Sequence, residues 1–373
     1  MAEQTQLRLI SAIDANKSSV RTKSLDLSFN ELLDMYRNSE LQINPEYQRL
    51  FRWSGGKQSR FIESLILEMP IPPIFVIEEE NGKYELIDGL QRISSYIHFR
   101  GFLSAPHLDI KEGDKLVLSE CDIIQELNGL TVDELPEAMV IRLKRMFIRV
   151  EVIRRESDRR LRYHMFKRLN TGGETLSEQE IRNCTIRLLD EKFNSFIIEL
   201  SRNEDFQQCI EFVSEQQRLQ LFDQELVLRF FTFKNKGAEY VHDVGDFMTD
   251  YMEQVSDGSI PFDYERERAV FERTFAILAR TLGEYSFGWL GKGGSPVARF
   301  SAYHYEAFTL GVQPILDRVD LGNPTAIERL KHEMLAIKAD NGFIDATTGG
   351  GKNSRLALGR RIDAVLNRLG ALR

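Results

Sequence analysis

The stretch IFVIEEENGKYELIDGLQRI, residues 74–93, decides how the first half of this chain folds. Residues 74–78 and 84–87 are rich in β-forming side chains, and the residues between them contain Asn81-Gly82, a dipeptide typical of tight hairpin turns. After Asp88-Gly89 the apolar residues recur at a period of 3.6, as in an amphipathic helix. The stretch therefore predicts a β-hairpin whose second strand passes directly into a helix.

The junction between this strand and this helix is a candidate ligand site. The first N–H groups of a helix have no partner within it, and they bind anions readily. Asp88 is placed to hold a metal ion or a water molecule, Gly89 lets a ligand approach the backbone, and Gln91 and Arg92 add donors. The structural alternative is a tight turn in which Asp88 caps the helix and Arg92 pairs with a surface acid.

The segments around this hairpin fit a fold that mixes strands and helices. Helical spacing predicts helices over residues 28–36, 57–69 and 158–169, and alternating apolar and charged residues predict a half-buried strand over 147–153. The fold class is therefore α+β.

From about residue 190 onward, strands are hard to find. Helical spacing occurs over residues 190–203, 214–234, 239–256, 263–283, 296–316, 323–340 and 354–370. We therefore predict an α+β domain over residues 1–190 and an all-helical domain over residues 191–373.

A second candidate site lies between two predicted helices. Its residues are Asn170, Thr171, Gly172, Gly173, Glu180, Arg182 and Asn183. Two adjacent glycines form a nest of backbone N–H groups suited to phosphate oxygens, and the amide, hydroxyl and guanidinium groups add donors. A glycine C-cap followed by a Ser177–Glu180 capping box explains part of this set, but it gives Asn170, Thr171 and Asn183 no role.

A third candidate is the segment NPEYQRLFRW, residues 44–53. Aromatic and arginine side chains alternate here beside a backbone that Pro45 restricts, a pattern able to stack on a base or clamp a phosphate. Tyr47 and Arg49 are its candidate ligand-binding residues. Packing of the aromatic rings in the core explains the same pattern.

The charge of the chain is unevenly distributed. Lys and Arg total 49 against 57 Asp and Glu, and the net charge of −8 disfavours non-specific binding of nucleic acid over the whole surface. Residues 142–168 nevertheless hold eleven basic residues against three acidic ones, a local charge of +8. This segment is a candidate DNA contact, and a solvated face with internal ion pairs is its structural alternative.

Several function classes lack their sequence signatures. The chain has 42% hydrophobic residues, which indicates a globular protein, and its three cysteines form no CxxC pair, so a zinc ribbon or disulfide framework is excluded. The six histidines never occur at the i, i+4 spacing of a zinc site, and residues 349–354 depart from the P-loop pattern. No secretion signal or membrane-spanning run is found, and we expect a cytoplasmic protein without membrane contact.

Several of these segments together resemble one family. They are PEYQR (45–49) with Trp53, IPPIF (71–75), IDGLQR (87–92), and FKRLNTGG (166–173) with EIRN (180–183). In this order and spacing, over roughly residues 25–235, they resemble the GmrSD restriction endonuclease N-terminal domain family, whose hallmark is Asp-Gly-Gln-Gln-Arg and whose fold is similar to ParB and sulfiredoxin.

The resemblance implies binding of a nucleoside triphosphate and, as in several members, hydrolysis that controls an attached or partner nuclease in anti-phage defence. We expect Mg²⁺ as the cofactor, because Asp88 is placed to hold it or to position water. The implied catalytic residues are Asp88, Gln91 and Arg92, with Asp88 also holding the metal. The implied nucleotide-binding residues are Tyr47, Arg49, Gly89, Asn170, Thr171, Gly172, Gly173, Glu180, Arg182 and Asn183. A partner nuclease in trans is the implied protein partner, and a second copy of the chain is a further candidate.

Two departures from the family pattern bear on function. Leu90 stands where the hallmark has its first Gln, which removes a polar group that would orient water or a base. The helical half also carries no HNH nuclease signature, so if this is a defence protein we expect cleavage to come from another polypeptide. Two alternatives stay open: a non-catalytic regulatory module that binds nucleotide or DNA, and a stand-alone metal-dependent nuclease.

Overall fold

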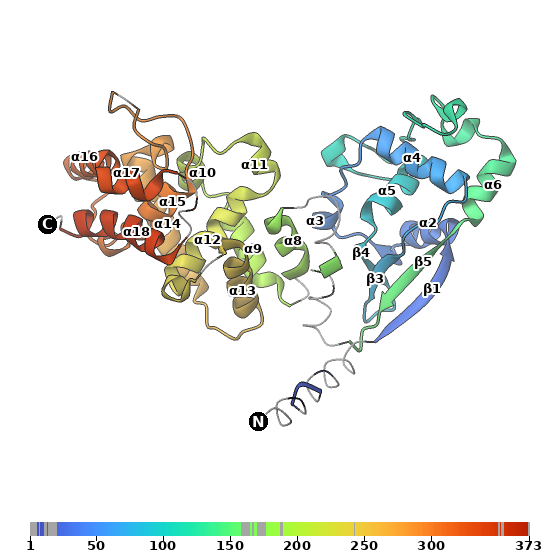
Figure 1. The fold of residues 1–373 in the computed structure, drawn as a ribbon, viewed down its shortest axis with the longest axis horizontal. Coiled ribbons are helices and arrows are strands. Elements are labelled where there is room, and N and C mark those ends of the chain that lie inside the picture. The colour runs from blue at the N-terminus through green and yellow to red at the C-terminus, as the bar shows by residue number, and fades with distance from the viewer. Residues whose placement is uncertain are drawn as a thin grey trace. The chain divides into compact units, whose positions relative to one another are not determined.

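The computed structural model describes most of the chain and divides it into two compact units, Met1–Leu176 and Ser177–Arg373 (Figure 1). It describes residues 21–157, 177–186, 189–241, 243–291, 293–349, 351 and 354–371, together with 6, 8–10, 13, 165, 168 and 169. Most of the helix predicted over 158–169 lies outside these described residues. Each unit is considered separately below.

The first unit is built on a five-stranded mixed sheet, as the α+β prediction requires. Its elements are β1 (Thr22–Ser28), α2 (Phe29–Arg37), β2 (Leu41–Gln42), α3 (Pro45–Gln48), α4 (Gly55–Ile66), β3 (Ile74–Glu78), β4 (Tyr84–Asp88), α5 (Leu90–Phe99), α6 (Glu137–Arg145) and β5 (Phe147–Ile153). The strand order is β1-β5-β3-β4-β2. Strands β3 and β4 form the predicted antiparallel hairpin, and β3 and β5 pair in parallel at the centre of the sheet.

Helices α2, α4 and α5 pack together through aromatic side chains. Phe29 of α2 lies 6.3 Å from Phe61 of α4 and 4.8 Å from Tyr96 of α5, measured between ring centroids. Helix α4 ends at Ile66, earlier than the spacing over 57–69 predicts, because Glu68 takes a left-handed backbone conformation (φ 56°) that a helix cannot continue through. The helix therefore stops before Pro70 is reached.

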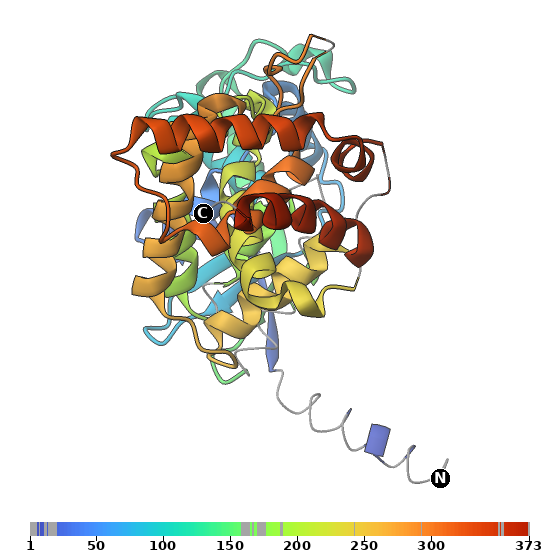
Figure 2. The same cartoon turned by 90° about the vertical axis from the view of Figure 1, so that its left-hand side faces the viewer.

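The second unit is helical over the described residues, as predicted. Its helices are α8 (Glu178–Ile186), α9 (Glu191–Leu200), α10 (Glu204–Cys209), α11 (Glu215–Leu219), α12 (Phe222–Lys236), α13 (Val244–Ser256), α14 (Tyr264–Thr281), α15 (Ala302–Gly311), α16 (Pro324–Ala339), α17 (Asn341–Thr347) and α18 (Arg355–Gly370). The single helix predicted over 214–234 is two, α11 and α12, because Leu221 has a left-handed φ of 60°. Helices α16, α17 and α18, red in Figure 2, pack against one another.

The core of the second unit is rich in phenylalanine. Phe230 and Phe231 of α12 contact Phe271 of α14, with ring centroids 5.5 and 5.8 Å apart, and Phe271 and Phe275 lie 4.5 Å apart. All four rings are fully buried. Aromatic burial of this extent supplies a large share of the stabilisation of a helical bundle.

A network of charged side chains centred on Glu306 also lies in the second unit. Glu306 of α15 is 1% exposed, and its carboxylate accepts hydrogen bonds from Arg229 of α12, at 2.7 Å, and from Arg361 of α18. Arg229 also bonds Glu225 one turn away, at 3.2 Å. The carboxylate of Glu306 thus joins three helices, and its charge is the counterion of two guanidinium groups.

A buried lysine, Lys338, links helix α16 to the loop after α14. The Lys338 ammonium, on α16, donates hydrogen bonds to the carbonyl oxygens of Tyr285, Ser286 and Gly288 at 2.8, 2.9 and 2.6 Å. Burial lowers the pKa of Lys338 to about 7, because the charged form loses its hydration. The three carbonyl acceptors replace part of that hydration and tie α16 to the loop after α14.

Candidate functional site

The junction between β4 and α5 depends on Gly89. Its φ is +100°, a left-handed conformation that costs little only for glycine. A Cβ at this position would also lie 2.3 Å from Cγ2 of Ile74, on the neighbouring strand β3. Both constraints favour glycine, and together they let the chain turn from strand to helix within one residue.

Asp88 and Arg92 form an ion pair across this turn. Nη2 of Arg92 donates to Oδ2 of Asp88 at 2.8 Å. The side chain of Arg92 is 14% exposed and that of Asp88 is 29% exposed. Nη1 of Arg92 donates to the carbonyl oxygens of Pro72 and Pro73 at 2.5 and 3.2 Å. Arg92 therefore also anchors the Pro72-Pro73 segment that leads into β3.

The first turn of α5 carries no side-chain cap. Gly89 is the N-cap residue, and Asp88, which the structural alternative assigns as the cap, bonds Arg92 instead. The first turn also contains no acidic residue. Leu90, which stands where the family hallmark has its first glutamine, is only 3% exposed and packs into the core. The junction thus offers backbone N–H groups beside a half-buried carboxylate and guanidinium.

Gln91 holds the third candidate segment against this junction. Its Oε1 accepts hydrogen bonds from the backbone N–H groups of Arg52 and Trp53 at 3.0 and 3.1 Å, and its Nε2 donates to the carbonyl oxygen of Leu50 at 2.6 Å. One side chain therefore satisfies three backbone groups of a loop about forty residues away in sequence. In this structure Gln91 is a positioning residue.

Two histidines and a glutamine support the same loop. Nε2 of Gln58 donates to the carbonyl oxygen of Trp53 at 2.8 Å, and Oε1 of Gln58 lies 2.8 Å from Nδ1 of His98. Burial lowers the pKa of His98, which favours its neutral form at this contact. His107 lies 3.1 Å, through Nε2, from the carbonyl oxygen of Phe51. Sequence reasoning missed these residues because no local pattern links them to residues 51–53.

The three hydrogen bonds from Gln91 to the backbone of residues 50–53, here called the Gln91 clamp, lead to a testable prediction. Gln91→Ala removes the acceptor shared by the amides of Arg52 and Trp53, and we expect hydrogen exchange at these two amides to accelerate by at least about tenfold. Gln91→Glu keeps a side-chain oxygen there, and it should retain most of the protection. Equal exchange rates in Gln91→Ala and the unsubstituted protein would contradict the clamp.

Tyr47 and Arg49 take different positions in this segment. Tyr47 is 4% exposed and belongs to the core, as the packing alternative for its ring predicts. Arg49 is exposed, and so is Arg52, whose backbone N–H is bound by Gln91. The loop therefore presents arginine side chains to solvent next to the first turn of α5.

The second candidate set is only partly described. Asn170, Thr171, Gly172 and Gly173 lie outside the described residues. Glu180, Arg182 and Asn183 lie on α8 and are each at most 3% exposed. The structure thus brings together Asp88, Gly89, Gln91, Arg92 and the 47–53 segment in the first unit, and it places the α8 residues in the second unit.

The α8 side chains are bound within the second unit. Arg182 donates to Glu178 at 2.7 Å, to Thr249 at 2.9 Å and to the carbonyl oxygen of Gly245 at 2.9 Å. Asn183 donates to Gln224 at 2.6 Å, and Glu180 accepts from the backbone N–H of Ser177 at 2.8 Å, which confirms the predicted capping box. These contacts fix α8 against α12 and α13.

Much of the described basic segment is paired with acids. Arg142 lies 3.4 Å from Glu68, Arg149 lies 3.1 Å from Asp26, Arg154 lies 3.7 Å from Glu78, and Arg155 lies 3.8 Å from Glu156. These pairs are the arrangement that the structural alternative predicts for residues 142–155. Because exposed pairs of this kind are weak, they leave the segment able to exchange partners.

Neither a metal-binding cluster nor a membrane-spanning helix occurs in the described part of the chain. Among the described residues no group of three or more His, Cys, Asp or Glu side chains is arranged to hold a metal ion. No described helix is both long and apolar enough to cross a membrane.

A protein-family model matches part of the chain. Residues 29–187 match the family described as GmrSD restriction endonuclease, N-terminal domain. No significant match was found among the curated proteins or among the solved structures. The matched range contains the β3–β4 hairpin, the Asp88–Arg92 junction, the 47–53 segment and α8. Residues 29–187 therefore belong to the GmrSD restriction endonuclease N-terminal domain family.

Proposed function

We propose that this chain is the nucleotide-responsive component of a restriction-type defence system, in which it binds a nucleoside triphosphate and controls a partner nuclease. The family membership of residues 29–187 supports the restriction-system part of this proposal. The observation that carries the nucleotide part is the uncapped first turn of α5 beside Asp88 and Arg92. Uncapped helix N-termini are well suited to phosphate groups.

The surroundings of this turn also fit a phosphorylated ligand. Gln91 holds residues 50–53 against the turn, and this loop presents the exposed Arg49 and Arg52. Guanidinium groups bind phosphate oxygens in a bidentate manner and are favoured in such sites. Arg92 is anchored by two carbonyl oxygens, so its remaining role is to set the position of Asp88.

Asp88 would supply one carboxylate ligand to the implied Mg²⁺. Magnesium bound with a nucleotide often takes only one or two carboxylates, with phosphate oxygens and water completing its shell, and Asp88 supplies one carboxylate that is 29% exposed. When bound, the ion would neutralise charge that develops on the phosphates. The chain's own contribution is to hold Asp88 through Arg92 and to present N–H groups from α5.

A second function, binding without hydrolysis, is favoured by a specific observation. Leu90 is buried, and the side-chain amide of Gln91 is bound to backbone groups of residues 50–53. Neither residue supplies a polar group for orienting an attacking water in this arrangement. A module of this kind would signal to a nuclease or to DNA by occupancy alone.

The test measures binding and turnover separately. Thermal unfolding of the full chain with ATP, GTP, CTP or UTP, with and without Mg²⁺, reports binding; a ligand at 100 times its dissociation constant should raise the melting temperature by roughly 3–4 °C. Phosphate release reports turnover. We expect Asp88→Asn to lower turnover by at least about 100-fold, because it removes the carboxylate charge but keeps the shape.

Glu80→Gln is the matched control, because Glu80 is an exposed acid in the turn of the same hairpin. It should leave binding and turnover unchanged. Binding without phosphate release would favour the non-catalytic function. No thermal shift with any nucleotide would contradict both functions and leave the junction as a structural turn.

A further inference from the structure

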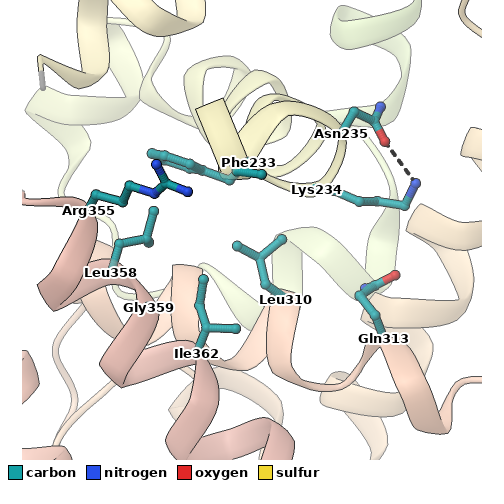
Figure 3. Close-up of a pocket in the computed structure, with 11 residues that line it drawn as sticks. Phe233, Lys234, Asn235, Leu310, Gln313, Arg355, Leu358, Gly359 and Ile362 are labelled. Carbon is teal, nitrogen blue, oxygen red and sulfur yellow. Dashed lines mark hydrogen bonds between the residues drawn. The ribbon is translucent and has the colours of Figure 1, made fainter. Parts of the chain in front are cut away.

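The second unit contains a cavity of about 590 Å³ between the end of α12, α15 and the start of α18 (Figure 3). Its apolar lining comes from Phe233, Leu310, Leu358 and Ile362. Figure 3 shows the leucine and isoleucine side chains pointing into the space between their helices. The volume lies within the range of about 300–1,000 Å³ that is common for small-molecule sites.

Two glycines keep this cavity open. Gly237 and Gly359 both line it, and a Cβ added at either position would meet no atom within 4 Å. Gly359 lies in the second turn of α18 without a positive φ, so neither backbone conformation nor close helix packing requires glycine there. Glycine disfavours a helix at such a position. The missing side chains instead leave volume for a ligand.

The charge at the rim is positive. Lys234 is neutralised by Glu267, whose carboxylate oxygens both lie 2.9 Å from its ammonium. Arg355 is exposed, and the described residues provide it with no ion pair. It is the first residue of α18, a 16-residue helix with no acid in its first turn. Because the N-terminal end of a helix is itself positive, an anion is the favoured neighbour for Arg355.

We propose that this cavity binds a small amphipathic organic anion. An aliphatic or aromatic body would contact Phe233, Leu310 and Leu358, and one carboxylate, sulfonate or phosphate group would pair with Arg355. The site lies wholly in the second unit and uses none of the residues of the β4–α5 junction. It is therefore independent of the proposed nucleotide function.

The test uses two fluorescent probes on the full chain. One is the anion 8-anilinonaphthalene-1-sulfonate, and the other is the uncharged N-phenyl-1-naphthylamine, which has a similar aromatic body. We expect saturable binding of both. Gly359→Leu fills the cavity and should weaken both probes by at least about tenfold. Gly370→Leu is the matched control, because Gly370 is on the same helix, has open space around its Cβ position and does not line the cavity.

Arg355→Gln tests the contribution of the Arg355 charge to probe affinity separately from that of the apolar lining. It should weaken the anionic probe by about tenfold and leave the affinity for the uncharged probe within about twofold. Unchanged affinities in Gly359→Leu would overturn the site. Equal effects of Arg355→Gln on both probes would overturn its anion selectivity. Thermal unfolding of each variant shows whether the fold is retained. Global unfolding would weaken both probes, so the loss of the anionic probe alone in Arg355→Gln cannot arise from it.

Discussion

Glu306→Gln is expected to lower the free energy of unfolding of the second unit by about 3–5 kcal/mol. The substitution removes the negative charge that lies 2.7 Å from Arg229 and that also pairs with Arg361, which is buried. Arg229, which is 12% exposed, keeps Glu225 as a partner, but an amide oxygen in place of the carboxylate cannot offset the charge of the buried Arg361.

The two tryptophans of the chain allow this effect to be measured in the correct unit. Trp289 belongs to the second unit and Trp53 to the first. In a Trp53→Phe background, urea unfolding followed by the fluorescence of Trp289 reports the second unit. Each variant is compared with this background protein.

Glu333→Gln is the control for Glu306→Gln. Glu333 pairs with Arg368 at 2.6 Å in the same unit, but the two side chains are 23% and 44% exposed respectively. Solvent screens this pair, and its loss should cost less than about 1 kcal/mol. If Glu306→Gln lowered the free energy of unfolding no more than Glu333→Gln does, the network of charged side chains around Glu306 would not be a determinant of stability.

Gly89→Ala is expected to lower the free energy of unfolding of the first unit by about 3 kcal/mol. A left-handed conformation costs an alanine roughly 1–2 kcal/mol, and the added methyl group would meet the side chain of Ile74, which is fully buried and cannot move freely. The strand-to-helix junction must then shift, and Asp88 with it. Urea unfolding followed by Trp53 in a Trp289→Phe background measures the loss.

Gly82→Ala separates the two causes. Gly82 has a φ of +76° in the turn of the same hairpin, and a Cβ there would meet nothing within 4 Å. Only the conformational cost remains, so we expect a loss of about 1 kcal/mol. Equal losses for Gly82→Ala and Gly89→Ala would show that the contact with Ile74 relaxes without cost.

The sequence was sufficient for the features whose causes are local. The β3–β4 hairpin follows from its Asn81-Gly82 turn and its β-rich flanks, and α5 follows from the apolar period after Gly89. The capping box of Ser177 and Glu180 is equally local. In each case the interacting residues lie within a few positions of one another.

At the candidate site, sequence reasoning identified residues but not all of their partners. The structure places Asp88, Gln91 and Arg92 together at the β4–α5 junction, and their role as a site stays a prediction. Arg92 was expected to bind a ligand or a surface acid, yet it pairs with Asp88 and with the carbonyl groups of Pro72 and Pro73. Gln91 was expected to act in catalysis, and it binds the backbone of residues 50–53. That catalytic role stays a prediction.

The sequence by itself determined the α+β fold class, the strand-to-helix junction and the family resemblance, because turn chemistry, periodicity and motif spacing are short-range properties. Only the tertiary structure decided the clamp of Gln91, the buried charge of Glu306 and the cavity at Gly359. Their partners are tens of residues apart in sequence, and no local pattern encodes which distant groups packing will bring within hydrogen-bond distance.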